Sequence, residues 1–379
     1  MVSSLYIHIP FCIKRCTYCD FVSGSYDAGK VNNYLVALKK EISGIPAVHL
    51  LETVYIGGGT PSALSSNALS DLMNHVVNHF EFATDYEATI EVNPGTLDRE
   101  MLTALKTAGI NRLSIGVQSF HNEELAVLGR IHSCDEAGQA ATLARDAGFE
   151  NVGIDLIYGI PGQTLDAWKS TLEQAVYLSP QHISTYELTV EEGTELAGVL
   201  KPLQRGSALS LLEEEIIIEM YKYTIDYLTS SGYVHYEISN FARPEFLCRH
   251  NLNYWNRGEY YGAGLGAHSC IGNRRFYNTA NFDEYVKTVS ENRDAVRESE
   301  LINKEKALSE AIFLGLRKTA GINLKAVSKA LDIDIVSTYL QVIHELHQDN
   351  LVDFDMITSH LRLTEKGRLL SNEVFIRFL

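Results

Sequence analysis

The chain has 379 residues and a formal net charge of −16, with 45% apolar and 21% charged residues. This length allows one large domain and a smaller second one, and the composition is that of an ordinary globular protein. The acidic charge and the lack of a dense Lys or Arg cluster argue against nucleic acid as a partner, because phosphate binding needs clustered cations. No apolar run approaches the roughly 18 residues of a membrane span.

The N-terminus and the cysteines indicate the compartment. Residues 1–10 lack a basic segment followed by an apolar one, so no signal peptide is expected and a cytoplasmic location is predicted. Three of the six cysteines, Cys12, Cys16 and Cys19, lie within eight residues of one another. A disulfide framework would be unusual in a long chain without a signal peptide, so close-set thiols predict metal or redox chemistry.

In the first half of the chain, short apolar runs alternate with segments of helical period. The expected strands are Leu5–Ile9, Thr53–Ile56, Ala88–Val92, Arg112–Val117, Val152–Tyr158 and His182–Leu188. The expected helices include Asn33–Ile42, Ala68–Asn78, Arg99–Ala108, Asp135–Ala147 and Leu165–Tyr177. Repeated βα units predict an α/β fold with a parallel sheet. The periodicity alone does not separate an open sheet from a partial barrel, but six units favour a partial (β/α)6 barrel.

Beyond residue 200 the alternation stops. A long helix is expected at Leu209–Thr229 and a strand at Tyr233–Phe241, and residues 242–283 are expected to wrap a site or another domain. The C-terminal part predicts a small winged-helix-like α+β domain. Its expected elements are the helices Lys304–Arg317, Leu324–Ala330 and Ile335–Gln348, the strands Leu351–Phe354 and Leu361–Leu363, and a last helix. The predicted regions are a barrel core at 1–200, a covering segment at 201–300 and a C-terminal domain at 301–379.

The spacing Cys12-x3-Cys16-x2-Cys19 places three thiols just after the first predicted strand. Thiolates suit zinc, copper(I) and iron–sulfur clusters. A structural zinc site needs four ligands, and His8, which could complete a Cys3His set, lies inside a predicted strand. Three thiolates on a [4Fe–4S] cluster leave one iron open to a cofactor or substrate. The motif therefore favours a cluster over zinc or unligated thiols.

Polar residues and glycines recur where the predicted strands end, which in a parallel α/β barrel is where the chemistry lies. The second strand is followed by Gly57-Gly58-Gly59-Thr60-Pro61, the third ends near Glu91, the fourth ends in Gln118, and the fifth carries Asp155. The glycines allow a ligand close to the backbone, although a tight turn would also explain them. Asp155 in an apolar strand needs a partner such as Arg130 or a ligand. Each residue alone suits a structural hydrogen bond, but together they predict convergence on a ligand.

The run from Tyr6 to Phe21, YIHIPFCIKRCTYCDF, resembles the radical SAM superfamily. More narrowly it resembles the oxygen-independent coproporphyrinogen III oxidase family, and within it the heme chaperone branch, over nearly the whole chain. The resemblance implies that the open iron of a [4Fe–4S] cluster chelates S-adenosylmethionine. It assigns S-adenosylmethionine contacts to Tyr6, Gly57, Gly58, Gly59, Thr60, Glu91, Gln118, Arg130 and Asp155. It further implies a second such molecule near Thr60, Gln118, Arg130 and Asp155.

Two departures separate the chain from the oxidase branch. The oxidases carry a further cysteine at the position of Phe21, and a longer segment before their cysteines than the eleven residues that precede Cys12 here. The cysteine is not a cluster ligand but is linked to turnover in the oxidases. Both departures argue against decarboxylation of coproporphyrinogen III.

The segment Arg249–Trp255 contains the HNxxYW pattern of the heme chaperone branch, with His250, Asn251, Tyr254 and Trp255. A neutral imidazole can bind heme iron, and aromatic faces pack on a porphyrin. Without the resemblance, a lone His in a loop is more often structural, and Cys248 is either a second candidate ligand or a small buried hydrophobe.

Three hypotheses follow for function. The first is a chaperone that binds heme and delivers it to a membrane-associated respiratory acceptor, with homodimerisation as one expected assembly. The second is an enzyme in which a 5′-deoxyadenosyl radical drives loss of carbon dioxide from porphyrinogen propionates. The third is a zinc-stabilised α/β protein without redox chemistry. The sequence leaves open whether S-adenosylmethionine is cleaved.

Overall fold

The computed structural model describes residues 2–47, 50–200 and 211–379. Its central feature is a nine-stranded sheet in the order β11-β1-β4-β5-β6-β7-β8-β10-β9. The six predicted strands are confirmed and run parallel: β1 (Ser4–Ile9), β4 (Leu50–Gly58), β5 (Glu81–Val92), β6 (Arg112–Gln118), β7 (Asn151–Tyr158) and β8 (His182–Glu187). Because β11 (Tyr261–Ala263) and β9 (Val234–Glu237) stand at the two ends of this order, the sheet remains open, as a partial barrel requires.

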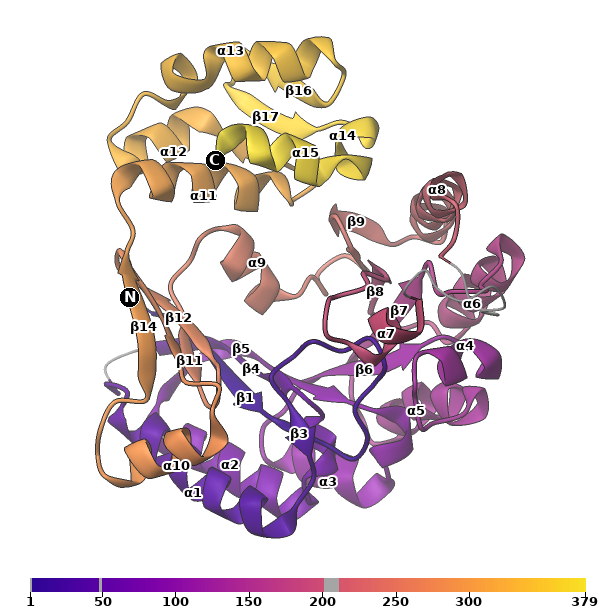
Figure 1. Ribbon diagram of the computed structural model, residues 1–379, viewed down its shortest axis with the longest axis vertical. Coiled ribbons are helices and arrows are strands. Elements are labelled where there is room, and N and C mark those ends of the chain that lie inside the picture. The colour runs from indigo at the N-terminus through magenta and orange to yellow at the C-terminus, as the bar shows by residue number, and fades with distance from the viewer. Residues whose placement is uncertain (1, 48–49, 201–210) are drawn as a thin grey trace.

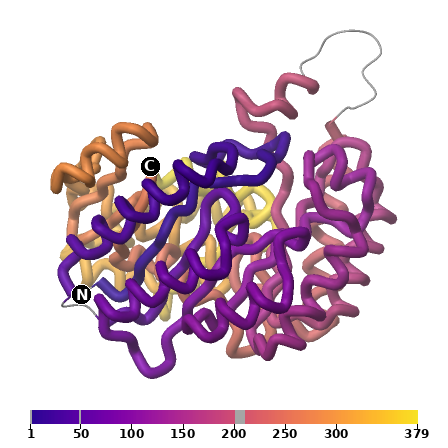
Figure 2. The backbone as a smooth tube through the Cα atoms, turned by 90° about the horizontal axis from the view of Figure 1, so that it is seen from below, coloured from indigo at the N-terminus to yellow at the C-terminus, as the bar shows by residue number. Residues whose placement is uncertain are grey.

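Five long helices cover one face of this sheet, and all five predicted ones are confirmed with small shifts at their ends. They are α1 (Ala28–Gly44), α2 (Ser66–His79), α3 (Arg99–Thr107), α5 (Cys134–Asp146) and α6 (Leu165–Tyr177). Each begins at a side chain that accepts a backbone N–H: Asp27, Ser65, Asp98, Ser133 and Thr164. Such a cap contributes about 1 kcal/mol to helix stability. Figure 2, seen from below, shows these helices in front of the sheet.

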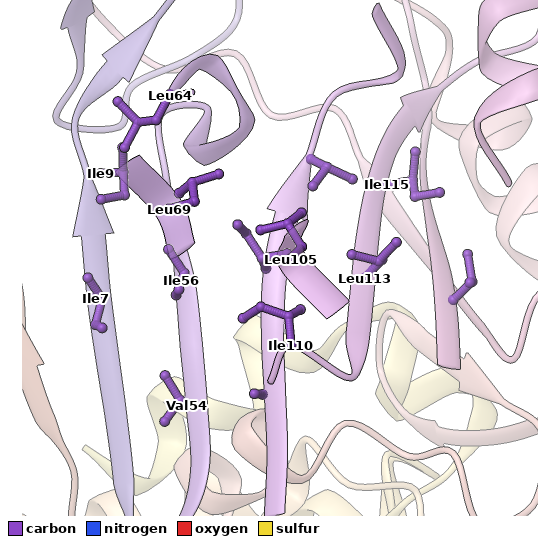
Figure 3. Packing of buried hydrophobic residues seen from close by; sticks show 14 of the residues in the cluster. Ile7, Ile9, Val54, Ile56, Leu64, Leu69, Leu105, Ile110, Leu113 and Ile115 are labelled. Carbon is purple, nitrogen blue, oxygen red and sulfur yellow. The ribbon is translucent and has the colours of Figure 1, made fainter. Parts of the chain in front are cut away.

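The two faces of the sheet differ in chemistry. Ile7, Ile56 and Leu113 are aligned across neighbouring strands and are fully buried toward the helices, where Leu69 and Leu105 pack nearby (Figure 3). Successive side chains of a strand point to opposite faces. The residues between these apolar positions therefore face the other side, and many of them are polar. They include Tyr6, Tyr55, Thr89, Arg112 and Ser114.

Residues 211–301 contribute the outer strands at both edges of the sheet, and one helix among them contacts its polar face. The predicted helix from Leu209 is shorter: positions 209–210 lie outside the described residues, and α8 begins at Glu214 and ends at Ser230. The single strand expected over Tyr233–Phe241 is a hairpin of β9 and β10 (Asn240–Ala242), with an irregularity between them. Residues 242–283, expected to have little regular structure, contain α9 (Arg249–Trp255), which lies over the sheet in Figure 1. Elements of three to seven residues show too few periods for the sequence pattern to reveal them.

A three-stranded antiparallel sheet and a helix follow α9. They are β12 (His268–Ile271), β13 (Arg274–Asn278), α10 (Phe282–Ser290) and β14 (Val296–Leu301). Further short elements among residues 2–200 are β2 (Phe11–Cys12), β3 (Gly24–Ser25), α4 (Asn122–Val127), α7 (Glu195–Leu200) and the 3-10 helices η1 (Pro61–Ala63) and η2 (Pro94–Thr96).

The C-terminal region has a hydrophobic core of its own, built around Leu308, Ile312, Ile343, Leu346 and Phe378. Its helices are α11 (Lys304–Leu316), α12 (Leu324–Leu331), α13 (Ile335–Gln348), α14 (Glu365–Leu369) and α15 (Ser371–Phe375). Its strands, in the order β15-β17-β16, are β15 (Ile322–Asn323), β16 (Val352–Asp355) and β17 (His360–Leu363). The predicted helices and hairpin are present, and the single last helix expected is two short ones. No helix of the described ranges is long and apolar enough to cross a membrane.

Candidate functional site

A cavity of about 370 Å³ opens at the C-terminal ends of the parallel strands. It brings together most of the residues singled out in the sequence. They are Cys12, Cys16, Cys19, Gly58, Gly59, Thr60, Glu91, Gln118, Arg130, Asp155 and, from α9, Asn251. Tyr6 and Gly57 do not line the cavity; the Tyr6 hydroxyl contacts His8 Nδ1 at 3.0 Å instead. The barrel collects the strand-end residues at one edge, and α9 brings Asn251 to the same cavity from more than 200 positions beyond Cys12.

The cysteine loop is fixed at both sides. Strand β2 pairs with β3, and Thr17 donates hydrogen bonds to the carbonyls of Val127 and Leu128. Cys12 is buried, whereas Cys16 and Cys19 are partly exposed. This anchoring presents three thiols to the cavity without further folding of the loop.

The surroundings of the thiols suit metal binding. Burial raises the pKa of the Cys12 and Cys19 thiols, so a bound metal must displace their protons. Arg130 Nη1 lies 3.5 Å from Cys16 Sγ, and Thr60 Oγ1 lies 3.7 Å from Cys12 Sγ, where its hydrogen bond favours the Cys12 thiolate. Within residues 2–47, 50–200 and 211–379, no group of three His, Cys, Asp or Glu side chains is placed to hold a single metal ion. A [4Fe–4S] cluster does not require that arrangement, because each thiolate binds a different iron.

The glycine run at the end of β4 is required by what packs against it. A Cβ at Gly57 would lie 3.0 Å from the Glu91 carboxylate, and one at Gly59 would lie 2.8 Å from the Phe11 carbonyl and 3.0 Å from Cys12 Sγ. Gly58 adopts a φ of +115°, a backbone conformation that residues other than glycine rarely adopt. The glycines therefore let the cysteine loop and the Glu91 carboxylate approach the same backbone, which explains more than a tight turn alone would.

Glu91 is the carboxylate best placed to meet a cation in the cavity. It accepts hydrogen bonds from the Tyr55 hydroxyl at 2.8 Å and from the Gly58 N–H at 3.1 Å. Burial, together with the negative charge of Asp155, raises the pKa of Glu91 to about 7. A cationic ligand group beside it, such as an amino group, would favour the charged form. The Glu91 carboxylate thus fits the amino group of S-adenosylmethionine, and the three thiols fit the cluster.

Asp155 and Arg130 are held separately. Ser114 Oγ donates to both oxygens of Asp155 at 3.2 and 3.0 Å, and burial raises the pKa of this carboxyl. Arg130 instead donates to Asn93 Oδ1 at 2.6 Å and to the Gly116 carbonyl. The direct pair between Arg130 and Asp155 suggested by the sequence is therefore wrong, because serine hydroxyls already satisfy the carboxylate and a strand end holds the guanidinium.

Gln118, the next cavity residue, shows backbone strain. Its φ is +69°, an unusual conformation for a residue that is not glycine. Such strain persists only where the surrounding structure holds it, and it occurs often at ligand sites. The observation agrees with the placement of Gln118 at the cavity.

Replacing Glu91 with glutamine is expected to remove a pH dependence of the stability of the cofactor-free protein. The pKa of Glu91 rises from 4.5 in the unfolded chain to about 7 in the folded one. The resulting stabilisation is complete below the unfolded pKa and is lost as the pH rises through about 7. Urea unfolding at about pH 5 and about pH 8 should therefore show a larger fall for wild type than for Glu91→Gln. Glu81→Gln, an exposed change on the same strand, is the control; an equal fall in wild type and Glu91→Gln would contradict the expectation.

The HNxxYW segment forms the helix α9, not the loop expected from the sequence. Its N-terminus is held by Glu87 of β5, whose carboxylate accepts the N–H groups of Arg249 at 3.0 Å and His250 at 3.1 Å. The Cys248 thiol also points to Glu87, at 3.7 Å, and burial raises the pKa of this thiol to about 12. Cys248 is therefore a buried, neutral cap residue in this structure.

His250 is 1% exposed and both of its ring nitrogens are engaged. Nδ1 lies 2.8 Å from Thr53 Oγ1, and Nε2 lies 2.8 Å from the Tyr254 hydroxyl. Since Thr53 donates its proton to Ser4, the network assigns the proton to Nδ1 and makes Nε2 the acceptor from Tyr254. Burial and the nearby Arg112 charge lower the pKa of His250 to about 3, so the imidazole is neutral.

The four motif residues point in different directions. The His250 ring stacks on Tyr55 of β4 with ring centroids 5.1 Å apart, and Asn251 lines the cavity. The Trp255 ring lies under the guanidinium of Arg317 from the C-terminal region, 4.3 Å away. Helix α9 therefore contacts the sheet, the cavity and the C-terminal region at once.

Sequence reasoning missed Tyr55, Glu87 and Arg112, which connect α9 to the sheet. Arg112 is 1% exposed, and its charge acts on Glu91, Asp155 and His250. The sequence does contain a pattern that could have indicated them: polar residues at every second position of the predicted strands. Such alternation indicates a sheet face that is turned toward a site and not toward covering helices.

Comparison with known proteins agrees with this architecture. Residues 6–175 match the model of the radical SAM superfamily and residues 302–370 that of the HemN C-terminal domain. The heme chaperone HemW of Lactococcus lactis subsp. lactis is 36% identical over 100% of this chain and 97% of its own length. That of Bacillus subtilis is 37% identical over 100% and 99%.

A solved structure shares the fold over nearly all of this chain. The coproporphyrinogen III oxidase HemN from Escherichia coli, a radical SAM enzyme, superposes with a TM-score of 0.86 at 27% identity, covering 99% of this chain and 89% of that one. The radical SAM match implies a [4Fe–4S] cluster and S-adenosylmethionine as cofactors, which the cavity residues fit. The chain belongs to the HemW family of radical SAM proteins.

Proposed function

We propose that the protein is a heme chaperone, which binds heme through the α9 segment and delivers it to an acceptor protein. Its HemW relatives are named as heme chaperones and match the full chain. One observation supports His250 as the residue that binds heme iron. His250 is neutral, and a single hydroxyl, that of Tyr254, occupies its Nε2 lone pair. Once that hydroxyl is displaced, the Nε2 lone pair of a neutral imidazole is a common ligand of heme iron.

Heme binding at His250 requires a movement of α9. Because His250 is buried against Thr53 and Tyr55, the iron reaches Nε2 only when the ring leaves the sheet and the Tyr254 hydroxyl turns away. Tyr254 and Trp255 then offer aromatic faces to the porphyrin, and Asn251 remains close to the cavity. The helix is thus the segment that changes between heme-free and heme-bound forms.

The cofactor residues are assigned within the same proposal. Cys12, Cys16 and Cys19 hold the cluster, whose open iron provides a chelation site for S-adenosylmethionine. Glu91 receives the amino group, and the glycine run keeps the backbone within reach of both. Thr60, Gln118, Arg130 and Asp155 line the rest of the cavity and orient the bound molecule.

The proposed acceptor is a membrane-associated respiratory heme protein, and the proposed place of transfer is the cytoplasm. All six cysteines are free thiols, which suits a reducing compartment. The proposal includes a homodimer as one assembly from which heme is transferred to the acceptor.

Replacing His250 with alanine is expected to weaken heme binding at least about tenfold and to shift the Soret band, because the axial ligand is lost. Heme titration followed by absorption measures both. Tyr254→Phe is the matched control: it keeps the aromatic face and removes the hydroxyl that occupies Nε2, so its heme affinity should equal or exceed that of wild type. Unchanged affinity in His250→Ala would refute the assignment.

The alternative function is oxygen-independent coproporphyrinogen III dehydrogenase, since the E. coli oxidase shares the fold. Phe21, where that branch is expected to carry a cysteine, is 62% exposed at the cavity. We expect no conversion of coproporphyrinogen III to protoporphyrinogen IX by reconstituted, reduced protein with S-adenosylmethionine. Turnover detected by mass spectrometry would favour the oxidase and return the HNxxYW segment to a structural role.

A further inference from the structure

Tyr55 connects the cavity to the helix that carries His250. Its hydroxyl donates to Glu91 Oε1 at 2.8 Å, and its ring stacks on the His250 ring with an interplanar angle of 29°. Tyr55 lies on β4, a central strand of the sheet, and itself lines the cavity. One side chain thus contacts both the carboxylate assigned to the cofactor and the imidazole assigned to heme.

The hydrogen bond to Glu91 fixes the orientation of the Tyr55 ring. A tyrosine ring has two side-chain torsions, and this bond together with the stack on Tyr6, whose ring centroid lies 6.3 Å away, restrains them. A cationic group that enters the cavity beside Glu91 favours the ionised carboxylate. An ionised acceptor makes a hydrogen bond roughly twice as strong as a neutral one. A cationic ligand group bound beside Glu91 therefore holds the Tyr55 ring more firmly against the His250 ring.

Heme binding favours the opposite position of α9. His250 presents Nε2 to iron only if α9 opens, and opening removes the imidazole from the Tyr55 ring. Two ligands that favour different positions of one element oppose each other, and the effect is reciprocal. Asn251, the neighbour of His250, also lines the cavity, so the cavity contacts the same helix at a second point.

We propose that Tyr55 is a positioning residue that couples the two sites, so that S-adenosylmethionine bound at Glu91 stabilises the closed α9 and lowers the affinity for heme. This inference rests on the proposed function and adds a direction to it: S-adenosylmethionine promotes heme release. Tyr55 touches neither the iron nor the cluster in this scheme; it acts through Glu91 and His250.

The test is a heme titration of the full-length, anaerobically reconstituted protein without and with saturating S-adenosylmethionine. In wild type, S-adenosylmethionine should raise the heme Kd about fivefold or more, the lower end of typical allosteric coupling. Tyr55→Phe keeps the ring and loses the hydroxyl. Heme and S-adenosylmethionine should both still bind to this variant, but its heme Kd should be nearly the same with and without S-adenosylmethionine. Tyr86→Phe removes a hydroxyl that donates to the Gly109 carbonyl at 3.0 Å and should keep the wild-type ratio.

The outcomes separate this inference from the proposed function. Heme binding that depends on His250 but is unchanged or strengthened by S-adenosylmethionine in wild type would overturn the coupling and leave the chaperone intact. A wild-type ratio in Tyr55→Phe would overturn the role of Tyr55. Absence of heme binding in wild type would overturn the proposed function, and the coupling with it.

Discussion

Replacing Cys16 with alanine is expected to abolish the iron–sulfur cluster of reconstituted protein. The three thiols of the motif are held around one cavity by a loop anchored at β2, β3 and Thr17, and among the described residues that line this cavity there is no fourth cysteine. With two thiolates the cluster would have two open irons and would be lost to solvent or chelators. Iron and sulfide content and the broad visible absorption should fall to background, and S-adenosylmethionine binding should be lost with them.

Cys134→Ala is the matched control for this loss. Cys134 is a partly exposed cysteine at the start of α5, and its thiol points to the neighbouring Asp135 rather than to the cavity. It should keep the full iron content. A cluster that survives in Cys16→Ala, or one that disappears in Cys134→Ala, would show that the ligands are not the three thiols of the motif.

The parallel core could be predicted almost entirely from the sequence. Its strands are apolar runs such as Val152–Tyr158, buried on the helical side, and its helices begin at capping residues such as Ser133 and Thr164. These signals are local, so a single sequence contains them. The hairpin β9–β10 and the helix α9 were not found, because each is short and depends on contacts made by distant segments.

The cavity could be predicted for a different reason. In a parallel barrel, topology alone brings strand ends together, so Glu91, Gln118 and Asp155 needed no knowledge of side-chain contacts. The placement of His250 could not be predicted this way. Its position depends on Glu87, which holds the N-terminus of α9, and on Tyr55, which supports the ring. These residues lie about 160 and 200 positions earlier, and no rule of spacing links them to the motif.

The same tertiary contacts explain why α9 is held on both sides. Toward the sheet, the helix is bound by Glu87 and Thr53. Toward the C-terminal region, Asn256 accepts a hydrogen bond from Lys318 and Arg257 donates to Glu310 at 3.0 Å. A movement of α9 on heme binding must therefore strain or release its contacts with α11.

Replacing Glu310 with alanine is expected to destabilise the folded protein by about 3 kcal/mol. The Glu310 side chain is 3% exposed and accepts from Arg257 Nε at 3.0 Å and from Arg275 Nη1 at 2.8 Å. Its removal leaves the guanidinium groups of Arg257 and Arg275, which are 15% and 31% exposed, without their shared carboxylate, and a partly buried charge that loses its partner costs more than a lost surface pair. Urea unfolding of the cofactor-free protein, monitored by circular dichroism, measures the difference.

Glu305→Ala, on the exposed side of the same helix, is the control and should change the stability by no more than about 0.5 kcal/mol. A Glu310→Ala variant as stable as wild type would mean that water replaces the carboxylate and that the two arginines are solvated in the folded state. A destabilised variant would instead establish the buried triad as the main polar link between α11 and the segment after α9. Because Arg257 follows α9 directly, the loss of that link should also leave the helix freer to open, which connects the stability of the C-terminal contact to access to His250.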